Sequence, residues 1–365
     1  MMMKGTKTVN SSQLLTVLFI GMIAIFFTSQ VMACADAIRV NELTIPILCY
    51  HKFCTGNSPD AYTINMKRFA QQMEFLKKNG YQVISISQLL QCIANNIFPE
   101  KPVVITIDDG FRSVYELAFP LLKEYHYLVT LFLYTDFIAN GPNQLSWQEI
   151  REMTEEGIEI GSHTLSHCNL LSIKKNESQK DYLERIKKEI FLSKSILENN
   201  TGNLVQSFAY PYGVYSQQVK MLAKQAGYCA LLNVNSMNNS LPVDAFSLNR
   251  QIIPAGCSME QFEAYLHEKA LRVNHVFPPD GTVTENQAIK IGAILDDPSI
   301  KPETLYFRLS GSGSLDYTFT SKSQEISFTP VAPKLLQKRT WIAQIAALDE
   351  ENGCKRKVSW LFTVK

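Results

Sequence analysis

Short apolar runs alternate with amphipathic stretches over the first two thirds of the chain. Each run has the length of a β-strand, and runs such as Val103–Ile107 and Val129–Tyr134 are apolar enough to be buried on both faces. The predicted strands are Ile45–Tyr50, Tyr81–Ile84, Val103–Ile107, Val129–Tyr134, Ile158–Gly161, Ser207–Tyr210, Tyr228–Val234 and Leu248–Ile253.

The stretches between these runs have the periodicity of helices. Apolar residues recur at helical spacing over residues 66–76 and 183–197, and Ser146 with Glu149 forms a predicted capping box. Strands that alternate with helices predict an α/β fold with a parallel sheet. Seven or eight such units predict a distorted (β/α)7–8 barrel, and an open doubly wound sheet is the alternative.

The pattern changes in the last quarter of the chain. Val276–Gly281 contains two prolines, an aspartate and a glycine, and is typical of a linker and turn. Beyond it we expect short strands at Thr304–Leu309, Asp316–Thr320, Glu325–Thr329, Trp341–Leu348 and Val358–Val364. Their number and spacing predict a small antiparallel sandwich of the immunoglobulin-like kind. We therefore predict an α/β domain over residues 35–275 and an all-β accessory domain over residues 276–365.

The N-terminus predicts export. Lys4 and Lys7 precede an uninterrupted apolar run, Leu14–Phe27, which is shorter than the about 20 residues that span a bilayer. Ala33–Ala35 fits the site of a signal peptidase, so residues 1–34 are predicted to be a signal peptide of a periplasmic or secreted protein. Two alternatives remain open: a lipoprotein acylated at Cys34, within a segment that resembles a lipobox, and an uncleaved membrane anchor.

Composition narrows the classes of partner. Apolar residues make up 46% of the chain and charged residues 19%, as in ordinary folded proteins. The formal net charge is +1, so no overall positive field favours nucleic acid. A membrane contact is expected only through the N-terminal segment or a lipid on Cys34. The 8 cysteines contain no CxxC pair, and their pairing is not predictable from the sequence.

Polar clusters follow several of the predicted strands. His51 comes after the first strand, Asp108 and Asp109 after the third, His163 after the fifth and Tyr210–Gly213 after the sixth. Because the carboxyl ends of parallel strands open on one face of a barrel, we expect these residues to converge there.

Two of the clusters predict a metal site. Asp108 and Asp109 repel each other in a shared pocket unless a cation is present, and a turn at Gly110 allows both to face one pocket. His163 and His167 are four positions apart, which on a helical turn places both imidazoles on one face. Two histidines and one carboxylate suit Zn²⁺, with Co²⁺, Ni²⁺ or Fe²⁺ as alternatives. The competing interpretations are a solvated Asp-Asp-Gly turn and two unrelated surface histidines.

Three motifs resemble those of a known family. Thr-Ile-Asp-Asp-Gly at 106–110, Ser-His-Thr-x-x-His at 162–167 and Tyr-Pro-Tyr-Gly at 210–213 are similar to the first three motifs of the polysaccharide deacetylases, the nodulation-protein-like carbohydrate esterases of family four. The resemblance covers about residues 43–255. Residues 48–53 and 144–147 also resemble the branch that deacetylates poly-β-1,6-N-acetylglucosamine in biofilms.

The resemblance implies a role for each matching residue. Asp108 takes the position of the general base, and Asp109, His163 and His167 take those of the metal ligands. Tyr212, next to Pro211, matches the residue whose backbone N–H holds the oxyanion, and His51 matches the general acid of the biofilm branch. With metal-bound water as nucleophile, such a set hydrolyses an N-acetyl group without a covalent intermediate.

The remaining candidates are less determined. Many members of the family carry arginine where this chain has Ala209, and Arg250 is expected either to orient Asp108 in its place or to form a structural ion pair. Trp147 is a candidate for stacking on a sugar ring, although aromatic residues at such positions more often belong to the core. His267 resembles a C-terminal motif of other relatives, but its charged, helical neighbours favour a surface position.

The sequence therefore predicts an exported, metal-dependent hydrolase that removes N-acetyl groups from a polysaccharide containing N-acetylglucosamine. An O-acetyl polysaccharide esterase is the alternative within the same chemistry. A non-catalytic carbohydrate-binding protein is the alternative from another class.

Overall fold

The computed structural model describes residues 43–311, 313–330 and 336–365. The predicted signal peptide and Cys34 lie outside the described residues. Within the described part of the chain, no helix combines the length and the apolar character needed to cross a bilayer.

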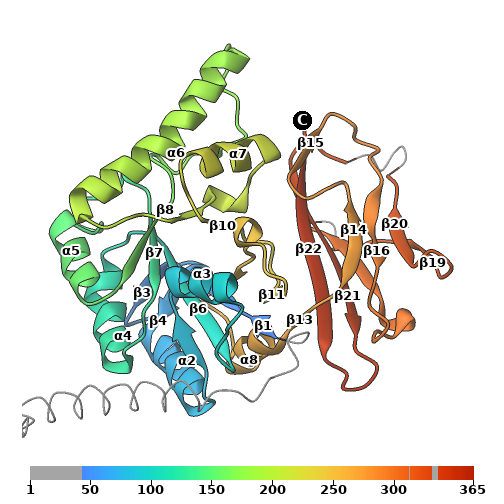
Figure 1. The fold of residues 1–365 in the computed structure, drawn as a ribbon, viewed down its shortest axis with the longest axis horizontal. Helices are drawn as coiled ribbons and strands as arrows, with labels where there is room; N and C mark the ends of the chain where they lie inside the picture. Colours follow the sequence, from blue (N-terminus) through green and yellow to red (C-terminus); the bar gives the residue numbers. More distant parts are fainter. Residues whose placement is uncertain (1–42, 312, 331–335) are drawn as a thin grey trace, which may run out of the picture. The chain divides into compact units, whose positions relative to one another are not determined.

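A parallel sheet forms the centre of the N-terminal region (Figure 1). Its strands are β2 (Ile47–Tyr50), β5 (Gln82–Ile84), β6 (Pro102–Asp109), β7 (Thr130–Leu133), β8 (Glu159–Ser162), β9 (Ser207–Ala209), β10 (Ala230–Leu232) and β12 (Gln251–Ile252). The spatial order is β10-β9-β8-β7-β6-β2-β12, with β5 beside β6, and these neighbours all pair in parallel. The predicted strands and their parallel arrangement are confirmed.

The two ends of this sheet nearly meet. An isolated parallel bridge joins Leu232 in β10 to Leu248, which lies just before β12. The Leu248 N–H donates to Leu231 O at 3.0 Å, and the Asn233 N–H donates to Leu248 O at 2.9 Å. The sheet is therefore a distorted barrel rather than the open doubly wound alternative.

Helices pack around the barrel sheet. They are α2 (Met66–Lys78), α3 (Ile86–Asn95), α4 (Phe119–Tyr125), α5 (Trp147–Glu155), α6 (Gln179–Thr201), α7 (Gln217–Gln225) and α8 (Met259–His267), with a π-helical segment η2 (Val114–Ala118) before α4. The predicted capping box is present at the start of α5, where the Ser146 hydroxyl accepts from the Glu149 N–H and the Glu149 carboxylate accepts from the Ser146 N–H. Buried side chains such as Phe69 and Met73 of α2 place the apolar face of each helix against the sheet.

Two short pairings lie at the margins of the barrel. β1 (Thr44–Ile45) pairs with β11 (Asn239–Ser240), and β3 (Lys52–Cys54) pairs with β4 (Thr63–Asn65). The second pairing is next to His51, so it fixes the segment that follows β2.

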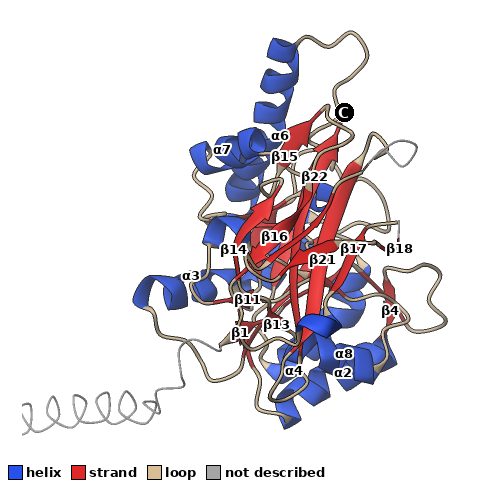
Figure 2. Ribbon diagram, turned by 90° about the vertical axis from the view of Figure 1, so that its right-hand side faces the viewer, coloured by secondary structure: helices blue, strands red, loops and turns tan. Residues whose placement is uncertain are grey.

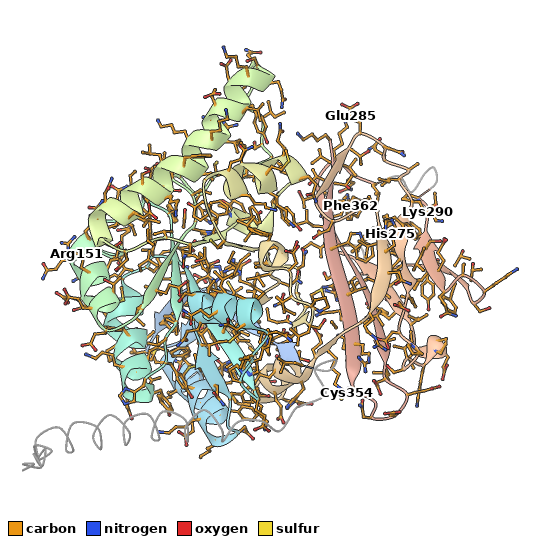
Figure 3. The ribbon with its side chains drawn as sticks, in the orientation of Figure 1. Arg151, His275, Glu285, Lys290, Cys354 and Phe362 are labelled. Carbon is orange, nitrogen blue, oxygen red and sulfur yellow. The ribbon has the colours of Figure 1, made fainter. Side chains whose placement is uncertain are left out.

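The C-terminal region contains two all-β sheets, seen in red in Figure 2. One has the order β13-β22-β21-β17-β18 with β15 beside β22, and the other has the order β14-β16-β20-β19. Their strands are β13 (Lys269–Ala270), β14 (Val273–Phe277), β15 (Thr282–Thr284), β16 (Ile291–Leu295), β17 (Tyr306–Leu309), β18 (Gly313–Ser314), β19 (Thr318–Thr320), β20 (Glu325–Phe328), β21 (Thr340–Leu348) and β22 (Lys355–Val364). Buried residues of both sheets, including Phe307, Ile326 and Phe362, form one cluster, and Phe362 is marked on β22 in Figure 3.

The predicted sandwich is present, with two differences. β13 and β14 begin before the predicted boundary at residue 276, because Leu271 is buried in the sandwich cluster and draws its segment into this region. In addition, β13 and β15 pair with β22 in parallel, so the sandwich is not purely antiparallel. Both strands are very short, and runs of two or three residues give little periodicity in a sequence.

The close packing of the barrel can be tested at Gly161 in β8. A Cβ atom there would lie 2.3 Å from Cε1 of Phe132 and 2.7 Å from Oγ of Ser207. We expect Gly161→Ala to lower the free energy of unfolding by about 1–3 kcal/mol, because neither neighbour has room to retreat inside the barrel. Urea denaturation measures the loss. Gly56→Ala is the control, since an added Cβ there meets nothing within 4 Å and should leave stability almost unchanged; equal effects of the two variants would contradict the packing.

Candidate active site

The predicted polar residues converge at the carboxyl ends of the barrel strands. His51 follows β2, Asp108 and Asp109 end β6, and His163 follows β8. All four line one cleft of about 340 Å³. The remaining lining residues are Lys52, Tyr62, Phe111, His167, Tyr210, Tyr212, Gly213, Val234, Arg250 and Ile252. The prediction that these residues, although far apart in sequence, meet on one face of the barrel is confirmed.

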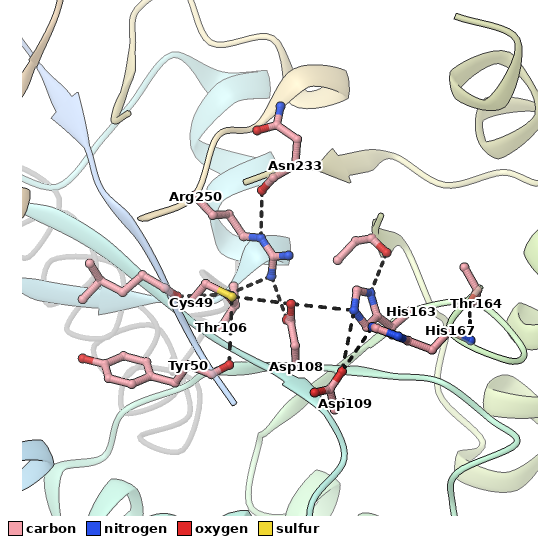
Figure 4. Close-up of polar contacts among 12 residues, drawn as sticks. Cys49, Tyr50, Thr106, Asp108, Asp109, His163, Thr164, His167, Asn233 and Arg250 are labelled. Carbon is pink, nitrogen blue, oxygen red and sulfur yellow. Dashed lines mark hydrogen bonds and ion pairs between the residues drawn. The ribbon is translucent and has the colours of Figure 1, made fainter. Parts of the chain in front are cut away.

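Asp109, His163 and His167 form a compact set of metal-binding groups (Figure 4). Asp109 Oδ1 lies 3.4 Å from His167 Nε2 and 3.9 Å from His163 Nε2, and one ligand atom from each residue lies within 4.8 Å of the others. The His163 Nδ1–H donates to the carbonyl oxygen of Ala209 at 2.7 Å. That bond leaves His163 Nε2 unprotonated and directed at the other two groups, as metal ligation requires.

Unusual backbone conformations bring these side chains together. Asp109 and Gly110 have φ angles of 80° and 99°, so the chain leaves the strand in a turn and both carboxylates reach the cleft. The prediction that His163 and His167 share a helical turn is wrong, because residues 163–168 are not helical. Thr164 and His167 have φ angles of 75° and 56°, and the Thr164 hydroxyl accepts the His167 N–H at 2.9 Å. A left-handed turn therefore brings the two imidazoles together, with ring centroids 4.8 Å apart.

Asp108 is held by a different set of contacts. Its Oδ1 accepts a hydrogen bond from Arg250 Nη1 at 2.7 Å, and both side chains are almost fully buried. Arg250 also donates to the Thr106 hydroxyl and to the carbonyl oxygen of Asn233. Burial alone raises the pKa of Asp108, but the positive field of Arg250, aided by His163 and His51, outweighs it and holds this pKa well below its usual range. Asp108 is therefore an ionised carboxylate with a fixed orientation.

Asp109 has the opposite electrostatic environment. Burial, together with the neighbouring charge of Asp108, raises its pKa to about 7. Burial lowers the pKa of His163 to about 3, so this imidazole is neutral at neutral pH. A carboxylate held against repulsion beside two unprotonated imidazole nitrogens suits a divalent cation, which would relieve that repulsion. The donor set of this chain thus fits the metal that its motifs imply.

His51 lies on the other side of Asp108. Its ring packs 5.1 Å from the ring of Tyr62, and its Nδ1 is buried without a hydrogen-bond partner among the described residues. Burial lowers the pKa of His51, and the charge of Asp108 opposes this effect. The imidazole is therefore predominantly neutral at neutral pH.

The Tyr210–Gly213 motif forms a tight turn at one edge of the cleft. Pro211–Gly213 is a short 3-10 helix, η3, in which Tyr212 and Gly213 have φ angles of 59° and 67°. A Cβ atom on Gly213 would lie 2.3 Å from a methyl group of Val234, so only glycine fits there. The Tyr212 ring is exposed and lies 4.7 Å from the His167 ring, whereas Pro211 is buried and outside the cleft lining.

Two candidate residues, Trp147 and His267, lie outside the cleft. Trp147 opens α5 and packs, half-buried, against the barrel core rather than lining the cleft. His267 ends α8, where its Nε2 lies 3.2 Å from the Tyr81 hydroxyl. The surface position expected for His267 is therefore the observed one.

Sequence reasoning missed several residues that line the cleft or lie next to its carboxylates. Cys49 lies with its Sγ 3.4 Å from Asp108 Oδ2 and, together with His51 and Asp108, forms a second group of close metal-binding atoms. Alternation along β2 places Cys49 and His51 on the same face, so this neighbour was predictable. Burial raises the pKa of the Cys49 thiol far above its usual value, so the thiol stays protonated. Asp108 already forms an ion pair with Arg250. The group of Cys49, His51 and Asp108 therefore does not suit a cation. Tyr62, Lys52 and Phe111 also line the cleft, but nothing in the sequence around them indicated this position.

The chain is similar to several known proteins. Residues 95–231 match the family profile described as polysaccharide deacetylase. The chain is 29% identical over 223 residues to the protein YxkH of Bacillus subtilis, covering 61% of this chain and 76% of that protein. It is 28% identical over 180 residues to the poly-beta-1,6-N-acetyl-D-glucosamine N-deacetylase of Staphylococcus aureus, covering 48% of this chain and 62% of that enzyme.

Solved structures agree with the fold. The Streptococcus pyogenes deacetylase PplD, determined in complex with acetate, superposes with a TM-score of 0.55 at 26% identity, covering 62% of this chain and 99% of PplD. IcaB from Ammonifex degensii superposes with a TM-score of 0.52 at 25% identity, covering 61% of this chain and 97% of IcaB. The range of this chain that matches the family profile includes Asp108, Asp109, His163, His167 and Tyr212. On motifs, fold and profile together, residues 95–231 are similar to the polysaccharide deacetylase domain.

Proposed function

We propose that this protein is an exported, metal-dependent deacetylase that removes N-acetyl groups from a polymer of N-acetylglucosamine. The observation that carries the proposal is the pairing of two adjacent carboxylates with different environments: Asp109 faces two imidazoles, and Asp108 faces an arginine. One carboxylate is thus suited to hold a cation and the other to accept a proton. The poly-beta-1,6-N-acetyl-D-glucosamine activity named for the staphylococcal relative supports the choice of polymer.

Asp109, His163 and His167 would hold the cation. When bound, it would supply Lewis-acid chemistry, polarising the acetyl carbonyl and making water acidic enough to lose a proton at neutral pH. The zinc preference rests on the mixed nitrogen and oxygen donors, which also accept cobalt, nickel or iron.

Asp108 would act as the general base. Its pKa is held well below the usual range, so it is ionised at neutral pH and free to take a proton from the attacking water. The hydrogen bond from Arg250 engages Oδ1, so Oδ2, which accepts a hydrogen bond only from the weaker donor Sγ of Cys49 among the described side chains, would be the oxygen that accepts the proton.

His51 and Tyr212, which both line the cleft, would complete the reaction. The Tyr212 backbone N–H is the proposed donor to the oxyanion that forms as the acetyl carbon becomes tetrahedral. His51, neutral at rest because burial lowers its pKa, would receive the proton that Asp108 takes from the attacking water and pass it to the departing amine. The charge of Asp108 beside it stabilises the protonated imidazole during that transfer.

Export is proposed from the N-terminal segment alone. Lys4 and Lys7 precede the apolar run Leu14–Phe27, which is the order of a signal peptide.

The substrate class and the base are tested together. Purified protein with added Zn²⁺ should release acetate from β-1,6-linked N-acetylglucosamine oligomers and much less from O-acetylated xylan oligomers. Asp108→Asn, which keeps the shape but cannot accept the proton, should lower kcat/KM by about 10²–10⁴-fold. Acetate quantification and mass spectrometry of the products measure both effects. Preferred release from the O-acetylated panel would favour the esterase alternative, and binding without release by the wild-type protein would favour the non-catalytic one.

The cation is tested by its ligands. We expect the wild-type protein to bind about one divalent ion per chain, and His163→Ala to lose both the ion and the activity, because only two donors remain. Elemental analysis after dialysis, and acetate release before and after chelation, measure these outcomes. His267→Ala is the control, since His267 contacts Tyr81 outside the cleft. Full activity of a metal-free wild-type protein would refute metal dependence.

The contact between Arg250 and Asp108 predicts a change in pH dependence. The base works only when ionised, so the acidic limb of kcat/KM follows the pKa of Asp108. Arg250 depresses that pKa; removing its charge with Arg250→Gln should therefore move the acidic limb to higher pH, and Arg250→Lys should move it less.

Loss of a buried partner also affects stability. Arg250→Gln should destabilise the fold by about 3–5 kcal/mol, because Asp108 is left buried and unpaired. The pH profiles must therefore be recorded at a temperature where circular dichroism shows each variant folded. An acidic limb that stays in place in a folded Arg250→Gln protein would show that Arg250 does not tune the base.

A further inference from the structure

Glu189 of α6 makes contacts that the proposed reaction does not use. Its side chain is 6% exposed, and its Oε2 accepts hydrogen bonds from the N–H groups of Leu165 at 3.1 Å and Ser166 at 2.9 Å. Its Oε1 accepts a third from the Ser166 hydroxyl at 2.7 Å. One carboxylate thus holds the middle of the turn whose two ends are His163 and His167.

The turn needs such a partner. Thr164 and His167 have positive φ angles, so no helical ladder is available to satisfy the N–H groups between them. The carbonyl oxygens of Thr164 and Leu165 are used by the N–H groups of Thr135 and Asp136, which fixes the opposite side of the turn. Without Glu189, two successive N–H groups would lose their acceptor, and the left-handed conformation would lose its support.

Glu189 is not explained by an ion pair. Among the described residues, no lysine or arginine nitrogen lies within 4 Å of its carboxylate, although burying a carboxylate is costly unless hydrogen bonds compensate it. A second contact from α6 reaches the same segment, since Ser193 Oγ lies 2.9 Å from Ser162 Oγ. The long helix therefore supports the strand end and turn that carry both histidines.

We propose that Glu189 is a positioning residue for the metal: it holds the 163–167 turn in the shape that directs both imidazoles at one cation. This inference rests on the proposed metal site. Hydrogen bonds that orient metal ligands are commonly worth about 10–100-fold in metal affinity. Glu189 would act one step further out, on the backbone between the ligands.

The test is the affinity of the protein for the metal itself. We expect Glu189→Ala to weaken Zn²⁺ binding by about 10–100-fold in competition with a chromophoric chelator. We expect Glu189→Gln to stay much closer to wild type, because its amide oxygen still accepts the two N–H groups and the Ser166 hydroxyl can turn to accept from its amide nitrogen. The visible spectrum of bound Co²⁺ should change with Glu189→Ala, since it reports the arrangement of the ligands.

A matched control separates positioning from general stability. Glu177 also accepts a backbone N–H, that of Lys174, and bonds to Arg185, but touches neither histidine. Glu177→Ala should lower stability while leaving Zn²⁺ affinity unchanged. Each variant is compared at a temperature where its metal-free form is folded by circular dichroism.

The outcomes distinguish this inference from the proposed function. A wild-type protein that binds no metal would overturn the function itself. If the wild type binds Zn²⁺ and folded Glu189→Ala binds it equally well, only the positioning role fails. Equal weakening by Glu189→Gln and Glu189→Ala would also overturn it, because the charge rather than the hydrogen bonds would then be responsible.

Discussion

The structure depends on how two neighbouring carboxylates are kept in one buried cleft. Asp108 and Asp109 end the same strand, and burial would drive both toward the neutral form. Arg250 resolves the conflict for Asp108 by a direct ion pair, and the two histidines create beside Asp109 the donor set that a cation needs. The two carboxylates are therefore placed in different environments. Asp108 is paired with Arg250, and Asp109 lies in a group of side chains that could hold a cation.

Much of the barrel was predictable because its elements are long or strongly patterned. The apolar runs at β6 and β7 and the capping box of α5 each give a clear local pattern, and the structure has them where they were expected. The strands β13 and β14 were not predicted, because they are held by pairing with β22 and β16 and have little periodicity of their own.

The site was predictable in its members more than in its geometry. Strand ends indicated His51, Asp108 and His163, but the spacing of His163 and His167 pointed to a helix, whereas left-handed residues make the turn. Glu189 and Tyr62 had no detectable pattern, because each acts through a contact between segments far apart in sequence. Arg250 was a candidate only because this chain has Ala209 where many members of the family carry arginine. Its sequence context did not show whether Arg250 orients Asp108 or forms a structural ion pair. In the structure, Arg250 forms a buried ion pair with Asp108, and the same contact fixes the orientation of that carboxylate.

The seam of the barrel has a consequence for folding. Leu248 joins the last part of the sheet to β10 through a single bridge, and Arg250 follows it by two residues, although its partner Asp108 lies 142 positions earlier in the chain. Contacts of such long sequence separation form late, because the intervening chain must first lose its freedom. Asp108 therefore acquires its counter-charge only when the ring of strands closes, so that a chain arrested before closure would leave this carboxylate without its ion pair.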